Sequence, residues 1–164
     1  MLIAIVSDIH DNIWQLKKVS QAINDLAAEV VIFCGDFCAP FTLKQLAEDF
    51  KGPIHVVWGN NDGDKWLLTT IAMNVGNVTL YGEHAELVVA GQKIAVNHYP
   101  TIGRRLAESG AYDLVCYGHD HLALIEQVGN TLLVNPGEVM GRFGKVTFAV
   151  YDTDHHEAKL VEIP

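Results

Sequence analysis

The segment Tyr117-Gly118-His119-Asp120-His121 places two imidazole side chains two residues apart, directly after a short apolar run. In an extended segment, residues i and i+2 point to the same side, so His119 and His121 can face one small object. A metal site is one interpretation, because neutral imidazoles bind divalent metals. A pair of solvent-facing histidines at the end of a strand is the other. Two ligands do not make a closed metal site. The choice between the two interpretations therefore depends on whether other parts of the chain supply further ligands.

Other apolar runs also end in side chains that can bind a metal. These are Asp8 and His10 after residues 2–6, Asp36 after 30–34, Asn60 and Asp62 after 55–58, His98 after 93–96, and His119 and His121 after 114–117. Singly, each is a common turn at the exit of a strand. Ligands of open α/β sheets gather outside the carboxyl ends of the strands. The five coincidences together therefore predict one convergent site.

The elements that must position these residues follow an α/β pattern. Short continuous apolar runs alternate with longer helical patterns, which is typical of buried parallel strands and their crossover helices. Helices are expected over residues 13–28, around 43–50 and around 66–70. After Gly76 the pieces become shorter, at 78–81, 85–89 and 93–96, and indicate that a second sheet starts there. From Leu122 onward the pattern predicts antiparallel hairpins, with turns at 129–130 and 152–155.

Composition limits the class of protein. The 164 residues are 49% hydrophobic and 19% charged, which predicts one globular domain over residues 1–164. A net charge of -9 argues against extended nucleic acid or an anionic membrane as a partner. No apolar run approaches the roughly 18 residues of a membrane span, and no signal peptide is visible, so we expect a cytoplasmic protein. Cys34, Cys38 and Cys116 are expected to be free thiols without a role as ligands.

Taken together, the motifs resemble those of the calcineurin-like metallophosphoesterases, in their order along nearly the whole chain. Within that superfamily they are similar to small prokaryotic phosphodiesterases related to vacuolar sorting protein 29. The motifs are Asp8-X-His10, Gly35-Asp36, Gly59-Asn60-X-Asp62, His98 and Gly118-His119-X-His121. The resemblance implies a four-layer α/β/β/α sandwich with two central mixed sheets. It also implies two divalent metal ions, with Mn²⁺ expected and Fe, Co, Ni or Zn as alternatives.

The resemblance further implies how the ligands are divided. One metal would be held by Asp8, His10, Asp36 and His121, and the other by Asp36, Asn60, His98 and His119, with Asp36 bridging. A hydroxide between the metals would attack phosphorus in line, so no covalent nucleophile is needed. Two divalent ions, two carboxylates and this hydroxide leave a charge of about +1, which attracts a phosphoryl group. We expect Asn60, Asp62 and His98 to serve catalysis, with Asp62 either orienting a ligand or the phosphate, or only forming a turn.

The chain departs from this pattern at several positions. Asn61 stands where many relatives have a histidine, and an amide cannot protonate a leaving group, which favours diesters with good leaving groups. Asp11 would repel a polyanion unless it points away from the metals. We expect Tyr99 to anchor a loop rather than wall a pocket, and Asn12 to cap the first helix. Glu138, where many relatives have serine, receives no role.

Three functions remain open. The leading hypothesis is a metal-dependent phosphodiesterase that acts on a small phosphodiester. A protein-interaction scaffold is the second, although every ligand position is filled in this chain. For such a scaffold, Trp14, Trp66, Ile102 and Leu106 are candidates for an exposed apolar patch. A phosphomonoesterase or nucleotidase is the third, and the absence of the histidine at position 61 weakens it. Family members are often dimers or larger, so a homodimer or higher oligomer is also expected.

Overall fold

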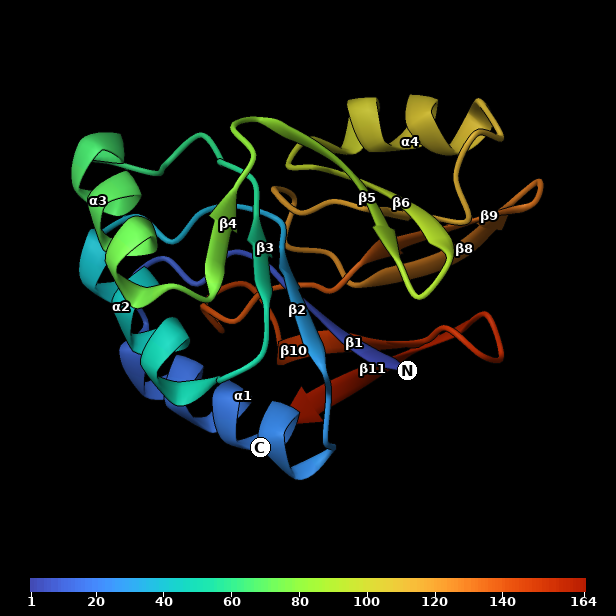
Figure 1. Ribbon diagram of the computed structural model, residues 1–164. Coiled ribbons are helices and arrows are strands. Elements are labelled where there is room, and N and C mark those ends of the chain that lie inside the picture. The colour runs from blue at the N-terminus through green and yellow to red at the C-terminus, as the bar shows by residue number, and fades with distance from the viewer.

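Two β-sheets lie face to face at the centre of the protein, with helices on both outer sides (Figure 1). The computed structural model describes all 164 residues, in eleven strands and four helices. Three helices, α1 to α3, cover one sheet, and α4 covers the other (Figure 1). The predicted four-layer α/β/β/α sandwich with two mixed sheets is therefore confirmed. No helix combines the length and the apolar character that a membrane-spanning segment needs.

The first sheet has the strand order β11-β10-β1-β2-β3-β4. Its parallel strands are β1 (Leu2–Val6), β2 (Val30–Phe33), β3 (Ile54–Val56) and β4 (Val78–Leu80). The hairpin of β10 (Val146–Asp152) and β11 (Glu157–Ile163) joins it antiparallel to β1. The prediction that the second sheet starts at residues 78–81 was wrong, because β4 pairs with β3. Hydrophobic periodicity locates a strand but does not identify its neighbour.

The second sheet has the order β5-β6-β7-β9-β8. Its strands are β5 (His84–Val89), β6 (Gln92–Asn97), β7 (Leu114–Cys116), β8 (Leu124–Val128) and β9 (Thr131–Asn135). The strands β6, β7 and β9 are parallel, whereas β5 and β8 are antiparallel edges. The predicted hairpin around residues 129–130 is the β8–β9 turn.

The helices of the first layer are α1 (Ile13–Asp25), α2 (Pro40–Asp49) and α3 (Lys65–Val75). Asn12 caps α1 as predicted, because its side chain accepts a hydrogen bond from Gln15 N at 3.2 Å. The helix α4 (Pro100–Glu108) was not predicted. Its buried residues are the small Gly103 and Ala107, although its apolar and polar residues are clearly segregated at a helical period. Glycine at position 103 lets α4 lie close to Tyr117, since a Cβ there would be only 3.1 Å from Cβ of Tyr117.

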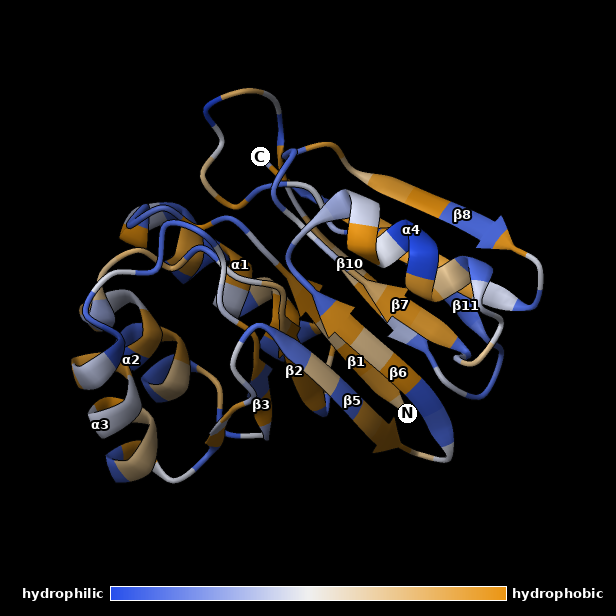
Figure 2. Ribbon diagram, turned by 90° about the horizontal axis from the view of Figure 1, so that it is seen from above, coloured by the Kyte–Doolittle hydropathy of each residue, from blue (hydrophilic) through white to orange (hydrophobic).

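Continuous apolar strands follow from burial on both faces. In β1, Ala4 and Val6 pack toward the helices, while Ile3 and Ile5 pack between the sheets. Figure 2 shows β1, β7 and β10 as hydrophobic along most of their length. Buried parallel strands of this kind have no polar face, which is why the site residues begin only where the strands end.

The four apolar residues considered for an interaction surface do not form one patch. Trp14 and Trp66 are exposed on the layer of α1 and α3, whereas Ile102 lies on α4 in the opposite outer layer (Figure 1). Leu106 packs partly against the small core beneath α4. The proposed four-residue interaction patch is therefore not present as a continuous surface.

Candidate metal centre

The loops that follow β1, β2, β3, β6 and β7 meet at one edge of the sandwich. Backbone hydrogen bonds tie them together: Asp8 N donates to Gly35 O at 3.0 Å, and Gly118 N donates to His98 O at 3.0 Å. All seven predicted ligands lie in these loops. The rule that strand ends converge thus explains why residues separated by more than a hundred positions are neighbours.

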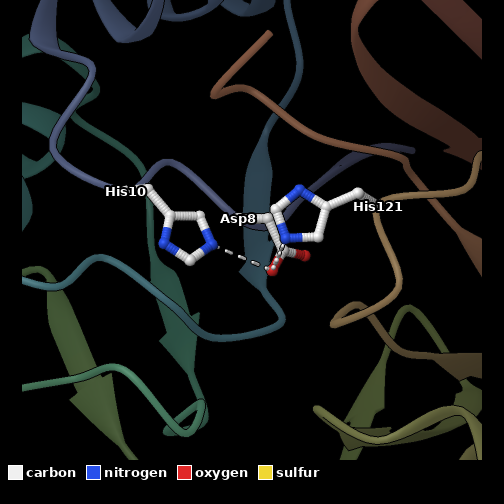
Figure 3. Close-up of side chains that lie close together, drawn as sticks. All are labelled: Asp8, His10 and His121. Atoms are coloured by element: carbon white, nitrogen blue, oxygen red, sulfur yellow. Dashed lines mark ion pairs between the residues drawn. The ribbon is translucent and has the colours of Figure 1, made fainter. Parts of the chain in front are cut away.

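One cluster surrounds the carboxylate of Asp8. Its Oδ1 lies 3.6 Å from His10 Nε2 and 3.5 Å from His121 Nε2. Figure 3 shows both rings directing a nitrogen toward this oxygen. Asp8 Oδ1 and His10 Nε2 are buried and have no hydrogen-bond partner. Buried polar atoms without partners are costly, and converging donors of this type fit a divalent cation.

A second cluster contains Asn60, His98 and His119. Asn60 Oδ1 lies 3.0 Å from His98 Nε2 and 2.8 Å from His119 Nδ1. The two ring nitrogens are 3.3 Å apart. An amide oxygen and two imidazole nitrogens facing one point again form a set of metal donors.

Asp36 reaches both clusters. Its Oδ2 lies 3.5 Å from His10 Nε2 and 3.4 Å from His98 Nε2. Burial raises the pKa of Asp36, but hydrogen bonds from His98 and Asn61 outweigh it and lower the pKa to about 2. Asn61 donates to Oδ2 through its side chain and to Oδ1 through its backbone, both at 2.8 Å. The carboxylate is thus ionised and placed where a bridging ligand would be.

The histidine rings are oriented by partners on their other nitrogen. His98 Nδ1 donates to Cys34 O at 2.7 Å, which turns Nε2 toward Asp36 and Asn60. His10 Nδ1 lies 3.4 Å from Cys38 Sγ, while its Nε2 faces Asp8. The Asp8 carboxylate, followed by the Cys38 thiol, raises the pKa of His10 to about 10. A metal ion at this place would replace that proton.

Comparison with known proteins identifies the family. The sequence model described as the calcineurin-like phosphoesterase superfamily domain matches residues 1–156. The chain belongs to this superfamily.

A curated relative and a solved structure similar to this calcineurin-like phosphoesterase both carry the name phosphodiesterase. Phosphodiesterase MJ0936 of Methanocaldococcus jannaschii is 32% identical over 160 residues, and the match covers 96% of each chain. The solved structure of a novel archaeal phosphodiesterase has a TM-score of 0.92 at 30% identity, over 99% of this chain and 100% of the other.

The resemblance to vacuolar sorting protein 29 is also confirmed, at the level of the fold. The structure of Vps29 from Entamoeba histolytica has a TM-score of 0.69 at 16% identity, with 100% of both chains covered. The superfamily implies divalent metal ions. In this phosphoesterase, Asp8 with His10 and His121, and Asp8 with Asp36 and His98, each offer donor atoms within 4.8 Å of one another.

Glu138 is a site residue that the sequence interpretation missed. Its side chain is buried, with 1% of the residue exposed, and Oε2 accepts a hydrogen bond from His121 Nδ1 at 2.6 Å. Its Oε1 accepts from Phe143 N at 2.6 Å and from Gly144 N at 2.8 Å. In this phosphoesterase, Glu138 therefore selects the tautomer of His121 that presents Nε2 to Asp8. No signal in the sequence indicated Glu138, because this residue follows the strand β9, after which no metal ligand was predicted.

Asp62 contacts backbone rather than ligands. It accepts hydrogen bonds from the backbone N–H groups of Gly59 at 2.7 Å, Asp36 at 3.1 Å, Phe37 at 2.7 Å and Cys38 at 3.1 Å. These four bonds occupy both carboxylate oxygens. Asp62 thus fixes the loops that carry Asp36 and Asn60, and acts on the site through the backbone.

Steric room explains the glycines of the motifs. A Cβ on Gly59 would overlap Asp36 Oδ1, and a Cβ on Gly118 would overlap Ser7 Oγ. Five of the seven predicted ligands have a left-handed backbone, which costs about 1–2 kcal/mol for each such residue. They are Asp8 (φ 55), His10 (φ 44), Asp36 (φ 67), His119 (φ 77) and His121 (φ 62). Strain of this kind gathers at functional sites, where the surrounding hydrogen bonds maintain it.

Two further predictions can be compared with the site of the phosphoesterase. Asp11 points away from the metal donors, since its Oδ1 accepts from Ala39 N at 2.8 Å and from Thr42 Oγ1 at 2.7 Å. Tyr99 does more than anchor a loop. Its ring lies edge-on to His98 and His119, with centroids 5.3 Å and 5.1 Å away. Tyr99 therefore forms part of the wall of the site.

Proposed function

We propose that the protein is a metal-dependent phosphodiesterase that hydrolyses a small phosphodiester with two divalent ions. The observation that carries the proposal is the position of Asp36 between two clusters of metal donors. Asp8, His10, Asp36 and His121 would hold one ion, and Asp36, Asn60, His98 and His119 the other. Mn²⁺ is the expected metal, with Fe, Co, Ni and Zn as alternatives. A relative named as a phosphodiesterase supports the same class of reaction.

When bound, the two ions would lower the pKa of a water molecule and would offset negative charge on the phosphoryl oxygens. The protein orients the donors: Cys34 O holds His98, Glu138 holds His121, and Asn61 holds Asp36. Hydrolysis forms a bond from the oxygen of water to phosphorus and breaks the bond to one ester oxygen. The products are a phosphomonoester and an alcohol or phenol. One proton of water stays with the new phosphate group and the other goes to the leaving oxygen.

Two residues favour a diester over a monoester as the substrate. Asn61 offers no proton to a poor leaving group, because its side-chain N–H bonds Asp36 and an amide is not an acid. Glu138 adds a buried carboxylate beyond those of Asp8 and Asp36, as Asp62 also does, so the charge of the loaded site falls below about +1. A site of lower positive charge attracts a dianionic monoester less and suits a monoanionic diester.

The direct test is hydrolysis of bis(p-nitrophenyl) phosphate by purified, chelator-stripped protein with and without Mn²⁺. We expect turnover only with the metal. A matched assay with p-nitrophenyl phosphate separates the two ester classes, since both substrates release the same phenolate. Absence of diester turnover with Mn²⁺, Ni²⁺ and Zn²⁺ would contradict the proposal and favour the interaction scaffold.

Addition of saturating Mn²⁺ to the stripped protein is expected to raise Tm by roughly 10 °C. Binding at a concentration of about a thousand times Kd stabilises the folded state by about 4 kcal/mol, and each kcal/mol shifts Tm by about 2–4 °C at this size. Differential scanning calorimetry measures the shift. Asp8→Asn should lose most of it, whereas the exposed control Asp25→Asn should retain it. A shift of the same size in both variants would place the metal elsewhere.

Glu138→Gln is expected to weaken metal binding by about 10- to 100-fold. The glutamine oxygen can keep the bonds from Phe143 N and Gly144 N, but its amide N–H then faces His121 Nδ1 and selects the wrong tautomer. Titration with Mn²⁺ by isothermal calorimetry measures the loss. The control is Glu157→Gln, because Glu157 is exposed at the start of β11. Unchanged affinity in Glu138→Gln would show that Glu138 is only structural.

A further inference from the structure

A groove of about 400 Å³ begins at His121 and runs outward to the edge strand β11. Its volume is within the range of about 300–1,000 Å³ that is typical of ligand pockets. Phe143, Leu122 and Leu160 are its large apolar lining residues. Four other surface grooves contain none of the site residues. This groove is thus continuous with the candidate metal centre.

Phe143 is held beside the site although its ring is exposed. The residue is 68% exposed, and its ring centroid lies 5.1 Å from that of His121, with the ring planes at 87°. The buried carboxylate of Glu138 binds both His121 and the backbone N–H of Phe143. The position of the aromatic ring is therefore coupled to the position of a metal ligand. Leu122 adds a second apolar side chain, which is also 68% exposed.

Charges in the groove are already paired. Lys145 Nζ lies 2.6 Å from Glu162 Oε2, and no other Lys, Arg, Asp or Glu lines the groove. The lining itself therefore holds no unpaired charge, although the guanidinium of Arg142 lies over Phe143, with its carbon 5.1 Å from the ring centroid. The walls offer the Phe143 ring and aliphatic side chains, which suit a flat, uncharged group.

Of the seven candidate donors only His121 lines the groove, which places the groove on one side of the site. In an in-line displacement the leaving group departs opposite to the nucleophile, away from the donors on the floor of the site. The ester substituent that remains on phosphorus extends sideways. The groove next to His121 is therefore placed for the substituent that remains, not for the one that leaves.

We propose that this groove binds a planar, uncharged substituent of the phosphodiester, such as an aryl group or a nucleobase, and that Phe143 is the residue that selects it. The inference rests on the proposed phosphodiesterase function and adds a substrate class to it. It predicts that diesters with an aromatic non-leaving group are better substrates than diesters with a small alkyl group.

The test compares bis(p-nitrophenyl) phosphate with methyl p-nitrophenyl phosphate, both with Mn²⁺. These diesters share the leaving group and differ only in the substituent that remains. Phe143→Ala is expected to lower kcat/KM about tenfold for the bis-aryl ester, as loss of one aromatic stacking partner does, and less than about twofold for the methyl ester. Phe143→Trp should restore the preference. Trp66→Ala, which removes an 83% exposed aromatic residue on α3, should change neither value.

The outcomes are distinguishable. An equal loss for both esters in Phe143→Ala would overturn the subsite and leave the phosphodiesterase function in place. In that case Mn²⁺ titration should show a weaker metal site, because Phe143 would act only through His121. Failure of the unaltered protein to hydrolyse either ester would remove the proposed function and this inference with it.

Discussion

Asp36→Asn is expected to reduce metal-dependent diester hydrolysis by about a thousandfold or more. Substitution of a residue that only orients a metal ligand lowers activity or metal affinity by about 10- to 100-fold. Asp36 itself contacts donors of both clusters, so we expect a larger loss. The amide is of the same size but neutral, and it can offer only one acceptor oxygen to the two clusters. The substituted site should therefore lose its bridging ligand and bind fewer than two ions per chain.

The measurement combines the rate of p-nitrophenolate release with metal content by atomic emission. Asp25→Asn makes the same chemical change at an exposed position on α1 and should keep both rate and metal content. A variant at position 36 that retains two ions and a rate within tenfold of the original would show that Asp36 does not bridge. Far-UV circular dichroism verifies that the fold is kept.

Asp62→Ala is expected to lower the free energy of unfolding by about 3 kcal/mol or more, even without metal. Four backbone N–H groups lose a charged acceptor, and each net hydrogen bond contributes about 0.5–1.5 kcal/mol, with a larger penalty where the donor stays buried. The consequence for function is indirect, since the loops that carry Asp36 and Asn60 would no longer be fixed.

Urea unfolding of chelator-stripped protein measures this change. The free energy of unfolding of Asp62→Asn should lie between those of the unaltered protein and Asp62→Ala. The amide of the asparagine retains one acceptor oxygen, which can serve two of the N–H groups. Asp25→Ala provides the exposed control. If Asp62→Ala abolished activity while stability remained unchanged, Asp62 would contact the phosphate or a ligand directly, which was the other role considered for it.

Two local errors in the predicted fold have different origins. The helix α4 has a helical period of apolar and polar residues, so its sequence held a signal that the prediction missed. The strand β4 was assigned to the wrong sheet because an edge strand has the same period whichever sheet it joins. Its neighbour is decided by what packs against the segment, and patterns within the segment do not contain that information.

The sequence by itself determined the strands, most of the helices, the family and the seven candidate ligands. It did so because strand ends in an α/β fold share one edge, and the ligands follow buried apolar runs whose period is local. Only the tertiary structure decided that Asp36 reaches both clusters, that Asp62 holds four backbone groups, and that Glu138 couples His121 to Phe143. These relations depend on hydrogen bonds with narrow limits of distance and angle between loops far apart along the chain, so they exist only once the sheets have packed.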